Sequence, residues 1–289
     1  ALRAALIGIP MAALPAIAMA AALPRFPPGA TWNQDISHAP QAADSVSMIA
    51  ALQGLGGWGT GGLLQIVFSM YVLHADATAP TAPVVAGGDG YYTPDCDTPG
   101  FAFPLPSGGA IEGESGYTCA GHGDCHLLVV QGNTLYEAYR ANLAGGSLQS
   151  ACALRWDLTR QYPRSGRGEQ CTSTDAAGFP VAALLFNADE VAEAMPGHGD
   201  IGHAIRFILP NARMAAGTYV HPATHAGGPN GPAATVPYGV RMRLKADFDI
   251  SRYDAAAQVL LRTMQRYGLV LADGGNIALT GEADRFTTA

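Results

Sequence analysis

The sequence predicts a mostly β protein of the α+β class, in which antiparallel sheets form a single β-sandwich or jelly-roll-like domain with a few peripheral helices. Glycine and proline occupy 36 and 20 of the 289 positions, and such a composition is typical of many turns that join short elements. Several short segments alternate apolar and polar residues with the period of a half-buried strand. Helical periodicity, in contrast, is confined to two segments.

Residues 1–22 have the composition of a secretory signal. Arg3 is followed by an apolar run, and Ala18-Met19-Ala20 provides the small residues of a cleavage site. An uncleaved membrane anchor is the alternative, although the prolines and alanines of the run make a poor membrane-spanning helix. We expect residues 23–289 to form one β-rich domain that is secreted or periplasmic, with no stable membrane span once the signal is cleaved.

The cysteines fit an oxidising compartment, because two disulfides and one free thiol would use all five. They are Cys96, Cys119, Cys125, Cys152 and Cys171. The spacing of Cys119 and Cys125 matches no standard zinc motif, which favours a disulfide-closed loop. The net charge of −7 and the scattered basic residues argue against a nucleic-acid partner.

The first expected element is a helix that Asp44 or Ser45 can cap. It ends at the glycine-rich segment 54–62, which we interpret as a tight loop because no phosphate-binding motif follows it. The apolar stretch 63–73 is too short to cross a membrane. It therefore predicts a buried strand.

The rest of the chain predicts short strands and one further helix. Residues 126–130 and 135–140 form a hairpin around Gln131-Gly132-Asn133. Asp254 caps a helix over residues 255–267, whose apolar stripe ends before a glycine. Other strands are expected at residues 153–158, 203–209, 269–272 and 277–280.

The most charged segment is residues 239–250, in which apolar and charged side chains alternate without a break. The charged set is Arg241, Arg243, Lys245, Asp247 and Asp249. Alternation predicts a strand whose ionic face is either a solvated sheet surface or the floor of a binding cleft. Arg155 and Asp157 in one strand, and Arg206 in another, repeat the pattern. We therefore expect a polar surface that several strands share.

Three histidines are candidate site residues. His221 and His225 lie four positions apart, where Pro222 indicates a strand end that passes into a loop. A loop can bring the two rings together, and with His203 they could bind a divalent metal such as zinc or copper. Alternatively, the histidines are hydrogen-bonding residues of a cleft.

Acidic residues offer acid–base chemistry. Asp175 is a candidate loop carboxylate, although Ser173 and Asp175 are also suited to capping a helical turn. Glu112 and Glu114 lie in a glycine-rich loop, where carboxylates are more often solvated or bound to calcium. One of them, paired with Asp157 or Asp175, would supply the two carboxyls that glycosidases use.

Five segments of the chain have distinctive sequences: WNQDIS, TSTDAAGFP, HAIRFILPNAR, TYVHPATH and RLKADFDIS. They resemble segments of a family of exported bacterial proteins of unknown function. The resemblance covers nearly all of the chain after residue 22. It implies secretion and a single domain, and it assigns no activity to any residue.

These features predict a secreted carbohydrate-active enzyme that acts on an extracellular polysaccharide. In a lyase, Lys245 or an arginine would neutralise a uronate while His221 or His225 takes a proton and a tyrosine serves as acid. In a hydrolase, two aspartates would be acid and base. The candidate catalytic residues are His203, His221, His225, Lys245, Asp157, Asp175 and Asp247. The candidate substrate-binding residues are Arg241, Arg243, Asp247, Tyr219 and Trp32.

Two other functions stay open. One is a non-catalytic extracellular protein that binds a glycan or a partner, and the other is a metal-dependent enzyme with histidine ligands. Convergence of the histidines and the ionic strand in one pocket would favour an enzyme, whereas a dispersed arrangement would favour binding.

Overall fold

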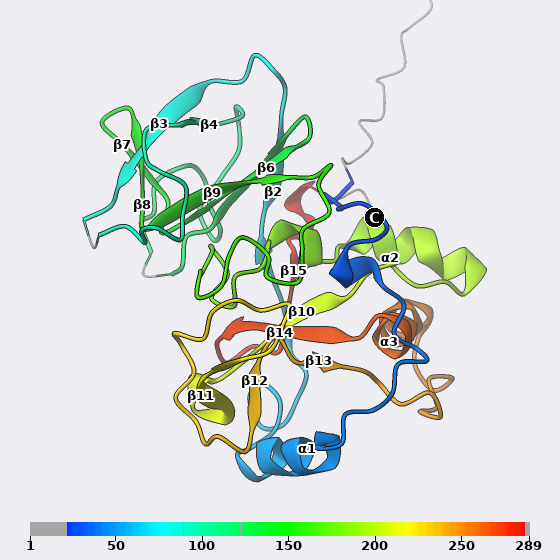
Figure 1. Cartoon of the computed structure of the whole chain (residues 1–289). Helices are drawn as coiled ribbons and strands as arrows, with labels where there is room; N and C mark the ends of the chain where they lie inside the picture. Colours follow the sequence, from blue (N-terminus) through cyan, green and yellow to red (C-terminus); the bar gives the residue numbers. More distant parts are fainter. Residues whose placement is uncertain (1–21, 89, 122, 287–289) are drawn as a thin grey trace, which may run out of the picture.

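The computed structural model describes residues 22–88, 90–121 and 123–286. The fold is mostly β, as predicted, with β-sandwich-like packing of antiparallel and mixed sheets (Figure 1). Residues 1–21 of the expected signal lie outside the described residues. Among the helices of the described ranges, none combines the length and the hydropathy that a membrane crossing requires.

A five-stranded mixed sheet organises one end of the molecule. Its order is β1-β15-β10-β14-β13, with bounds β1 (Ile66–Met70), β10 (Ile205–Leu209), β13 (Arg241–Met242), β14 (Leu269–Gly274) and β15 (Leu279–Glu282). The central pair β10–β14 is parallel, and β15 is antiparallel to β10. A parallel pair, β11 (Met214–Tyr219) and β12 (Val236–Tyr238), lies beside this sheet (Figure 1).

Two four-stranded sheets form the other end (Figure 1). One has the order β2-β5-β6-β9, with bounds β2 (Val72–Ala75), β5 (Leu127–Gln131), β6 (Thr134–Tyr139) and β9 (Cys152–Asp157). The other has the order β4-β3-β8-β7, with bounds β3 (Thr81–Ala86), β4 (Ala102–Pro104), β7 (Asn142–Ala144) and β8 (Ser147–Ser150). The predicted hairpin is confirmed as β5–β6.

The predicted strand 63–73 is divided between the two ends. β1 pairs with β15, whereas β2 pairs with β5 in a different sheet. The β2-β5-β6-β9 sheet is apolar on both faces. Leu128 of β5 packs in one hydrophobic cluster, while Leu127 and Val129 pack in another. The predicted burial is confirmed for Val72 and Leu73 of β2. It is wrong for the first part of the segment, where Leu63, Leu64, Ile66 and Phe68 are 64, 43, 37 and 50% exposed.

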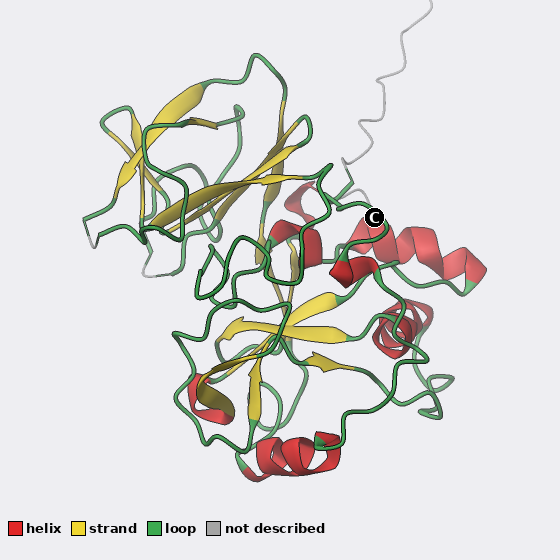
Figure 2. Cartoon of the chain, in the orientation of Figure 1, coloured by secondary structure: helices red, strands yellow, loops and turns green. Residues whose placement is uncertain are grey.

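The helices α1 (Ser45–Gly54), α2 (Ala188–Ala194) and α3 (Ala255–Arg266) lie around the sheets (Figure 2). α3 confirms the expected helix, and the Asp254 carboxylate accepts a hydrogen bond from Ala257 N at 2.8 Å as its N-cap. α1 confirms the helix that begins after Asp44, but Asp44 makes no side-chain cap. The sequence did not predict α2.

The predicted ionic strand is wrong beyond β13, which pairs with β14 over two residues only. After Met242 the backbone leaves the sheet edge. The Gln265 side chain of α3 donates to the carbonyls of Lys245, Ala246 and Phe248 at 3.0, 3.4 and 3.4 Å. These carbonyls are thus bound by a helix side chain and not by a neighbouring strand. The alternating segment after Met242 is therefore a turn-rich loop and not a strand.

The disulfides agree with the sequence. Cys96 is bonded to Cys152, Cys119 is bonded to Cys125, and Cys171 is a free thiol. The expected pattern of two disulfides and one thiol is therefore confirmed, as is the disulfide-closed loop at Cys119.

Candidate functional site

Two loops and the end of one strand meet in the five-stranded half of the molecule. Residues 169–178 lie against residues 219–225, since Thr224 N donates to Ala177 O at 2.9 Å and Thr224 Oγ1 donates to Cys171 O at 2.7 Å. Ala177 N donates to Ala272 O of β14 at 2.9 Å. Gly178 has a positive φ of 90°, and a Cβ there would clash with Thr224 Oγ1. Only glycine permits this close approach.

A buried ion pair lies beneath these loops. Arg206 and Asp175 are 2% and 0% exposed, and Arg206 Nε donates to Asp175 Oδ2 at 3.1 Å. Arg206 Nη1 donates to Thr280 Oγ1 of β15 at 2.6 Å, and Nη2 lies 3.7 Å from Asp273 Oδ2. One buried guanidinium thus lies between two carboxyls.

A β-bulge gives Asp273 its position. Arg206 is paired with Val270, but the register shifts after Phe207, so that Ile208 is opposite Asp273. In an unbroken register Asp273 would point away from Arg206, because successive side chains alternate between faces. The extra residue brings Asp273 to the face of Arg206, and bulges commonly redirect side chains next to functional sites.

Burial dominates the protonation of the two carboxyls. It raises the pKa of Asp175 to about 7, against the opposing charge of Arg206 and with a contribution from the nearby charge of Asp273. Asp175 Oδ1 is buried and has no hydrogen-bond partner among the described residues. Burial also raises the pKa of Asp273, although 27% of its side-chain surface is exposed and solvent moderates the effect. Asp273 is thus a carboxyl with a raised pKa that reaches solvent.

His225 approaches the same place through the backbone of Ala176. Ala176 N donates to Asp273 Oδ2 at 3.3 Å, and Ala176 O lies 3.0 Å from His225 Nδ1. Gly227 N can only donate to the same nitrogen, at 3.2 Å, whereas the Ala176 carbonyl can only accept from it. The shorter contact, to Ala176 O, favours the tautomer with the proton on Nδ1 and the lone pair on Nε2.

A second hydrogen-bonded group lies on the exposed side of these loops. Tyr219 Oη donates to Glu169 Oε2 at 2.7 Å, and His221 Nε2 donates to Glu169 Oε1 at 2.7 Å. Gln170 Nε2 donates to Tyr219 Oη at 3.0 Å. The hydrogen bonds from Tyr219 and His221 lower the pKa of Glu169. His221 and Glu169 are 39% and 51% exposed, so this trio is accessible from solvent.

Four of the predicted site residues therefore belong to one region: Asp175, Tyr219, His221 and His225. Sequence reasoning missed Arg206 as a buried residue, and it missed Asp273 and Glu169 entirely. The only signal for Asp273 is its position at the end of an apolar strand, where an acidic residue is out of place unless it has a partner.

His203 does not belong to this region. It is 1% exposed, Nδ1 donates to Ala204 O at 2.8 Å, and Nε2 lies 3.8 Å from Glu190 Oε1. Burial and the charge of Arg25 lower the pKa of His203. The structure therefore does not bring His203 together with His221 and His225, as its predicted role as a catalytic residue or metal ligand requires, because its ring is enclosed with other partners.

The arginines of the predicted ionic face donate to backbone carbonyls. Arg241 donates to the carbonyls of Tyr267, Thr31 and Gln34 at 2.7, 2.8 and 2.9 Å, and Arg243 donates to Ile36 O. Both guanidinium groups thereby connect residues 31–36 to the sheet edge. These contacts give the two arginines a structural role, and their predicted role in substrate binding stays a prediction.

Asp157 and Trp32 likewise have partners outside the region around Asp273. Asp157 Oδ1 accepts from Thr159 N and Oγ1 at 2.9 and 2.6 Å, which is a local turn. Trp32 is 6% exposed and packs edge-on against Phe179 at 5.6 Å. Lys245 and Asp247 line a separate pocket with no residue of the region around Asp273.

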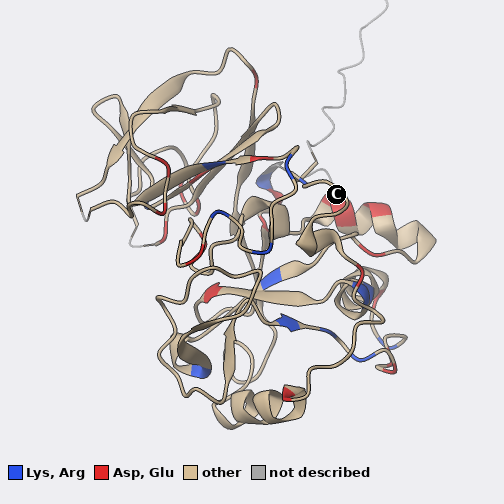
Figure 3. Cartoon of the chain, in the orientation of Figure 1, with Lys and Arg blue, Asp and Glu red and all other residues tan. Residues whose placement is uncertain are grey.

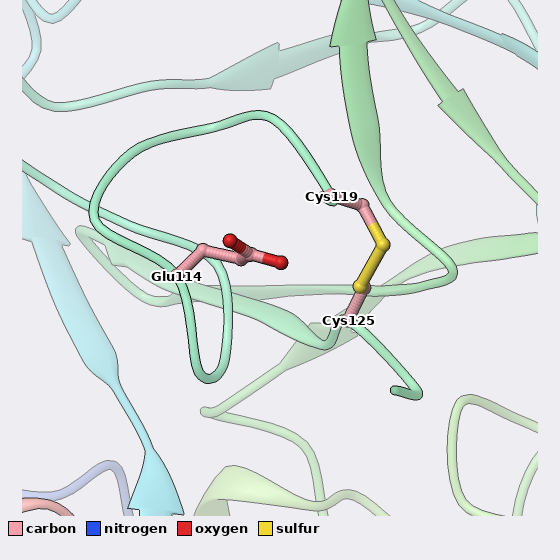
Figure 4. Close-up of side chains that lie close together, drawn as sticks. All are labelled: Glu114, Cys119 and Cys125. Atoms are coloured by element: carbon pink, nitrogen blue, oxygen red, sulfur yellow. A yellow bond between two sulfur atoms is a disulfide. The ribbon is translucent and has the colours of Figure 1, made fainter. Parts of the chain in front are cut away.

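Within the described ranges, one group of potential metal ligands lies close together: Glu114, Cys119 and Cys125 (Figure 4). Both sulfurs belong to a disulfide, which removes the thiolates that would bind a metal. Glu114 Oε1 instead accepts from Ala120 N and Gly121 N at 2.9 and 2.8 Å. The three residues therefore belong to a disulfide-closed loop that the Glu114 carboxylate stabilises.

Glu112 likewise has a structural partner. Glu112 Oε2 lies 2.8 Å from His126 Nδ1, and His126 Nε2 lies 3.0 Å from Thr174 O. Both partners are acceptors, so both ring nitrogens carry protons. Burial is the largest single influence and opposes that charge, but the hydrogen bond and charge of Glu112, together with the Thr174 carbonyl, outweigh it and raise the pKa of His126 to about 9. Thr174 precedes Asp175, so this pair supports the loop of the candidate site.

Charged residues are otherwise spread thinly over the molecule (Figure 3). No family model matches this chain, and neither a curated protein nor a solved structure shows significant similarity to it. Function must therefore be argued from the geometry of the site.

Proposed function

We propose that this protein is an exported enzyme that hydrolyses an extracellular polysaccharide, with Asp273 as the acid and His225 as the base. The observation that supports the proposal most directly is a partly exposed carboxyl with a raised pKa next to a buried carboxyl–guanidinium pair. Strongly perturbed carboxyls in such a setting are typical of acid–base sites. The two disulfides agree with export.

Hydrolysis fits the arrangement better than elimination by a lyase. A lyase would need a free cation to neutralise the uronate, but Arg206 is buried between carboxyls and Arg241 is occupied by backbone carbonyls. Lys245 lies in a different pocket. A carboxyl with a raised pKa can serve as a general acid, in contrast, and a histidine can serve as a general base.

In the proposed reaction, Asp273 donates its proton to the glycosidic oxygen as the bond to the anomeric carbon breaks. His225 Nε2 takes a proton from the water whose oxygen bonds to that carbon. Exchange with solvent returns both groups to their starting state. Asp175 and Arg206 are positioning residues, because they are buried and act on substrate only through Asp273. The trio of Tyr219, Glu169 and His221 would bind sugar hydroxyls at the exposed side.

The test compares the wild type with Asp273→Asn and His225→Gln on a panel of polysaccharides, with release of reducing ends as the readout. We expect each variant to lose about 10²–10⁴-fold in rate, the usual contribution of a general acid or base. The activity should fall as the pH rises, because Asp273 must be protonated to act as the acid. Asp44→Asn, an exposed carboxylate that precedes α1 and makes no side-chain cap, is the matched control and should keep the full rate.

Two outcomes would overturn the proposal. One is a wild type that degrades a polysaccharide while both variants keep its rate. The other is a folded wild type that degrades none of the panel, which would leave a non-catalytic binding function for the region.

A further inference from the structure

The loop between β13 and α3 forms an open pocket of about 470 Å³, within the range of roughly 300–1,000 Å³ in which small ligands bind. Its lining residues are Lys245, Asp247, Phe248, Asp249, Arg252 and Tyr253. The proposed hydrolase mechanism uses none of them. The pocket therefore needs an explanation of its own.

The loop that forms the pocket is held in place. Gln265 of α3 donates to three of its carbonyls. Asp249 Oδ1 accepts from Ser251 N and Oγ at 3.0 and 2.6 Å, and Arg252 Nε donates to Asp249 Oδ2 at 3.2 Å. Fixed positions matter because a preformed site loses less entropy when a ligand binds.

Two aromatic rings are presented to solvent in this pocket. Phe248 and Tyr253 are 39% and 45% exposed, with ring centroids 6.0 Å apart and planes inclined at 35°. Large apolar groups that stay exposed together, beside polar groups, commonly mark a binding site. Ring faces of this kind pack well against the C–H face of a sugar.

The charges of the pocket indicate which ligand it would accept. Asp249 and Arg252 satisfy each other. Within the ranges that the structure describes, neither the Lys245 ammonium nor the Asp247 carboxylate has a hydrogen-bond or ion-pair partner. The lining carries two cations and two anions, so it has no excess of positive charge for a phosphate. It offers one free donor and one free acceptor beside aromatic rings.

We infer that this pocket is a sugar-binding subsite, separate from the Asp273 region, which takes a hexopyranose ring. Phe248 and Tyr253 contact the ring face, Asp247 accepts hydrogen bonds from its hydroxyls, and Lys245 donates to a hydroxyl or to the carboxylate of a uronate. The inference does not depend on hydrolysis, since a non-catalytic glycan-binding protein would use the same pocket.

The experiment measures binding by calorimetry on the full chain carrying Asp273→Asn, so that the probe is not degraded. The probes are a neutral hexose oligosaccharide, cellotetraose, and an acidic one, tetragalacturonate. We expect at least one to bind with a Kd of about 1 mM or tighter. Tyr253→Ala should weaken binding by at least about tenfold, which corresponds to 1.4 kcal/mol.

The matched control is Tyr92→Ala, because Tyr92 is 47% exposed but lies outside the pocket. Lys245→Ala distinguishes the ligands: it should abolish most of the preference for tetragalacturonate if a uronate is bound and change both affinities equally if the ring is neutral. The inference is overturned if neither probe binds, or if Tyr253→Ala and Tyr92→Ala bind as tightly as the parent.

Discussion

The pocket between β13 and α3, lined by Lys245, differs from the region around Asp273 in how its charged side chains are distributed and solvated. The pocket lies in the segment where the sequence places five charges in nine residues, and its charged side chains are exposed and mostly local in their contacts. In the Asp273 region, Asp175, Arg206 and Asp273 come from segments far apart in the chain. Both carboxyls lie beside the one buried guanidinium, that of Arg206.

The two regions differ in how well a charged residue in the sequence indicates a functional site. A cluster of charges along a chain is cheap to keep when water solvates it, so its density says little about a site. A lone arginine within an apolar strand such as β10 is different, because an unpaired charge in the interior is strongly unfavourable. Partners must exist for Arg206, and finding them leads to Asp175 and Asp273.

The largest effect should come from Arg206→Met. Removing one partner of a buried ion pair destabilises by roughly 3–5 kcal/mol, which urea unfolding at pH 8 would measure. The loss should widen as the pH rises through about 7, because Asp175 ionises there in the wild type and would hold its proton longer without Arg206. The control, Arg252→Met, removes a guanidinium that is 80% exposed and should leave the unfolding midpoint unchanged. Equal midpoints for the two variants would contradict the comparison.

The next effect concerns pH and the pair Glu112–His126. The pKa of His126 is raised to about 9, so its contribution to stability is complete below its unfolded value and is lost as the pH rises through 9. Burial would raise the pKa of Glu112, but the hydrogen bond and charge of His126 lower it to about 2. Its contribution is therefore lost as the pH falls from about 4 towards 2.

A series of thermal unfolding midpoints from pH 2 to pH 10 checks this expectation. The Glu112–His126 pair should contribute fully from about pH 4.5 to 6.5, and the wild type should lose that contribution at both limits. His126→Gln should flatten the alkaline limb. An alkaline limb of the same steepness in that variant would show that other groups are responsible.

The smallest structural effect should come from Glu169→Gln in the exposed trio. Because His221 and Glu169 are both well exposed, the unfolding midpoint should not change measurably. If the trio binds substrate as proposed, KM should rise several-fold while kcat stays close to that of the wild type, which is the signature of lost ground-state binding. Unchanged values of both would exclude the trio from the site.

Local signals predicted local structure well. The cap at Asp254 and the apolar stripe of α3, and the β5–β6 hairpin around Gly132, depend on contacts between near neighbours in the chain. The number of disulfides followed from the cysteine count. Strict alternation was the signal that failed, since the chain after Met242 has no strand to pair with and turns towards α3 instead.

The functional region could be predicted only in part. His221, His225 and Asp175 were recognisable because their residue types stand out in their loops. Asp273 could not be assigned to them, because a bulge in the pairing of β10 with β14 decides which face it occupies. The burial of Arg206 and the partnership of Glu169 with Tyr219 are likewise contacts across many residues.

Patterns in the sequence predicted that this protein is mostly β, where its capped helix α3 and its main hairpin lie, and how many of its cysteines pair. These follow from periodicity, capping and composition, whose physical causes act within a few residues. Contacts between distant segments place Asp175 and Asp273 on either side of Arg206, connect His225 to Asp273 through the backbone of Ala176, and make the charged segment after β13 an exposed pocket. Burial and partnership decide what a charge does, and both depend on which distant segments pack together.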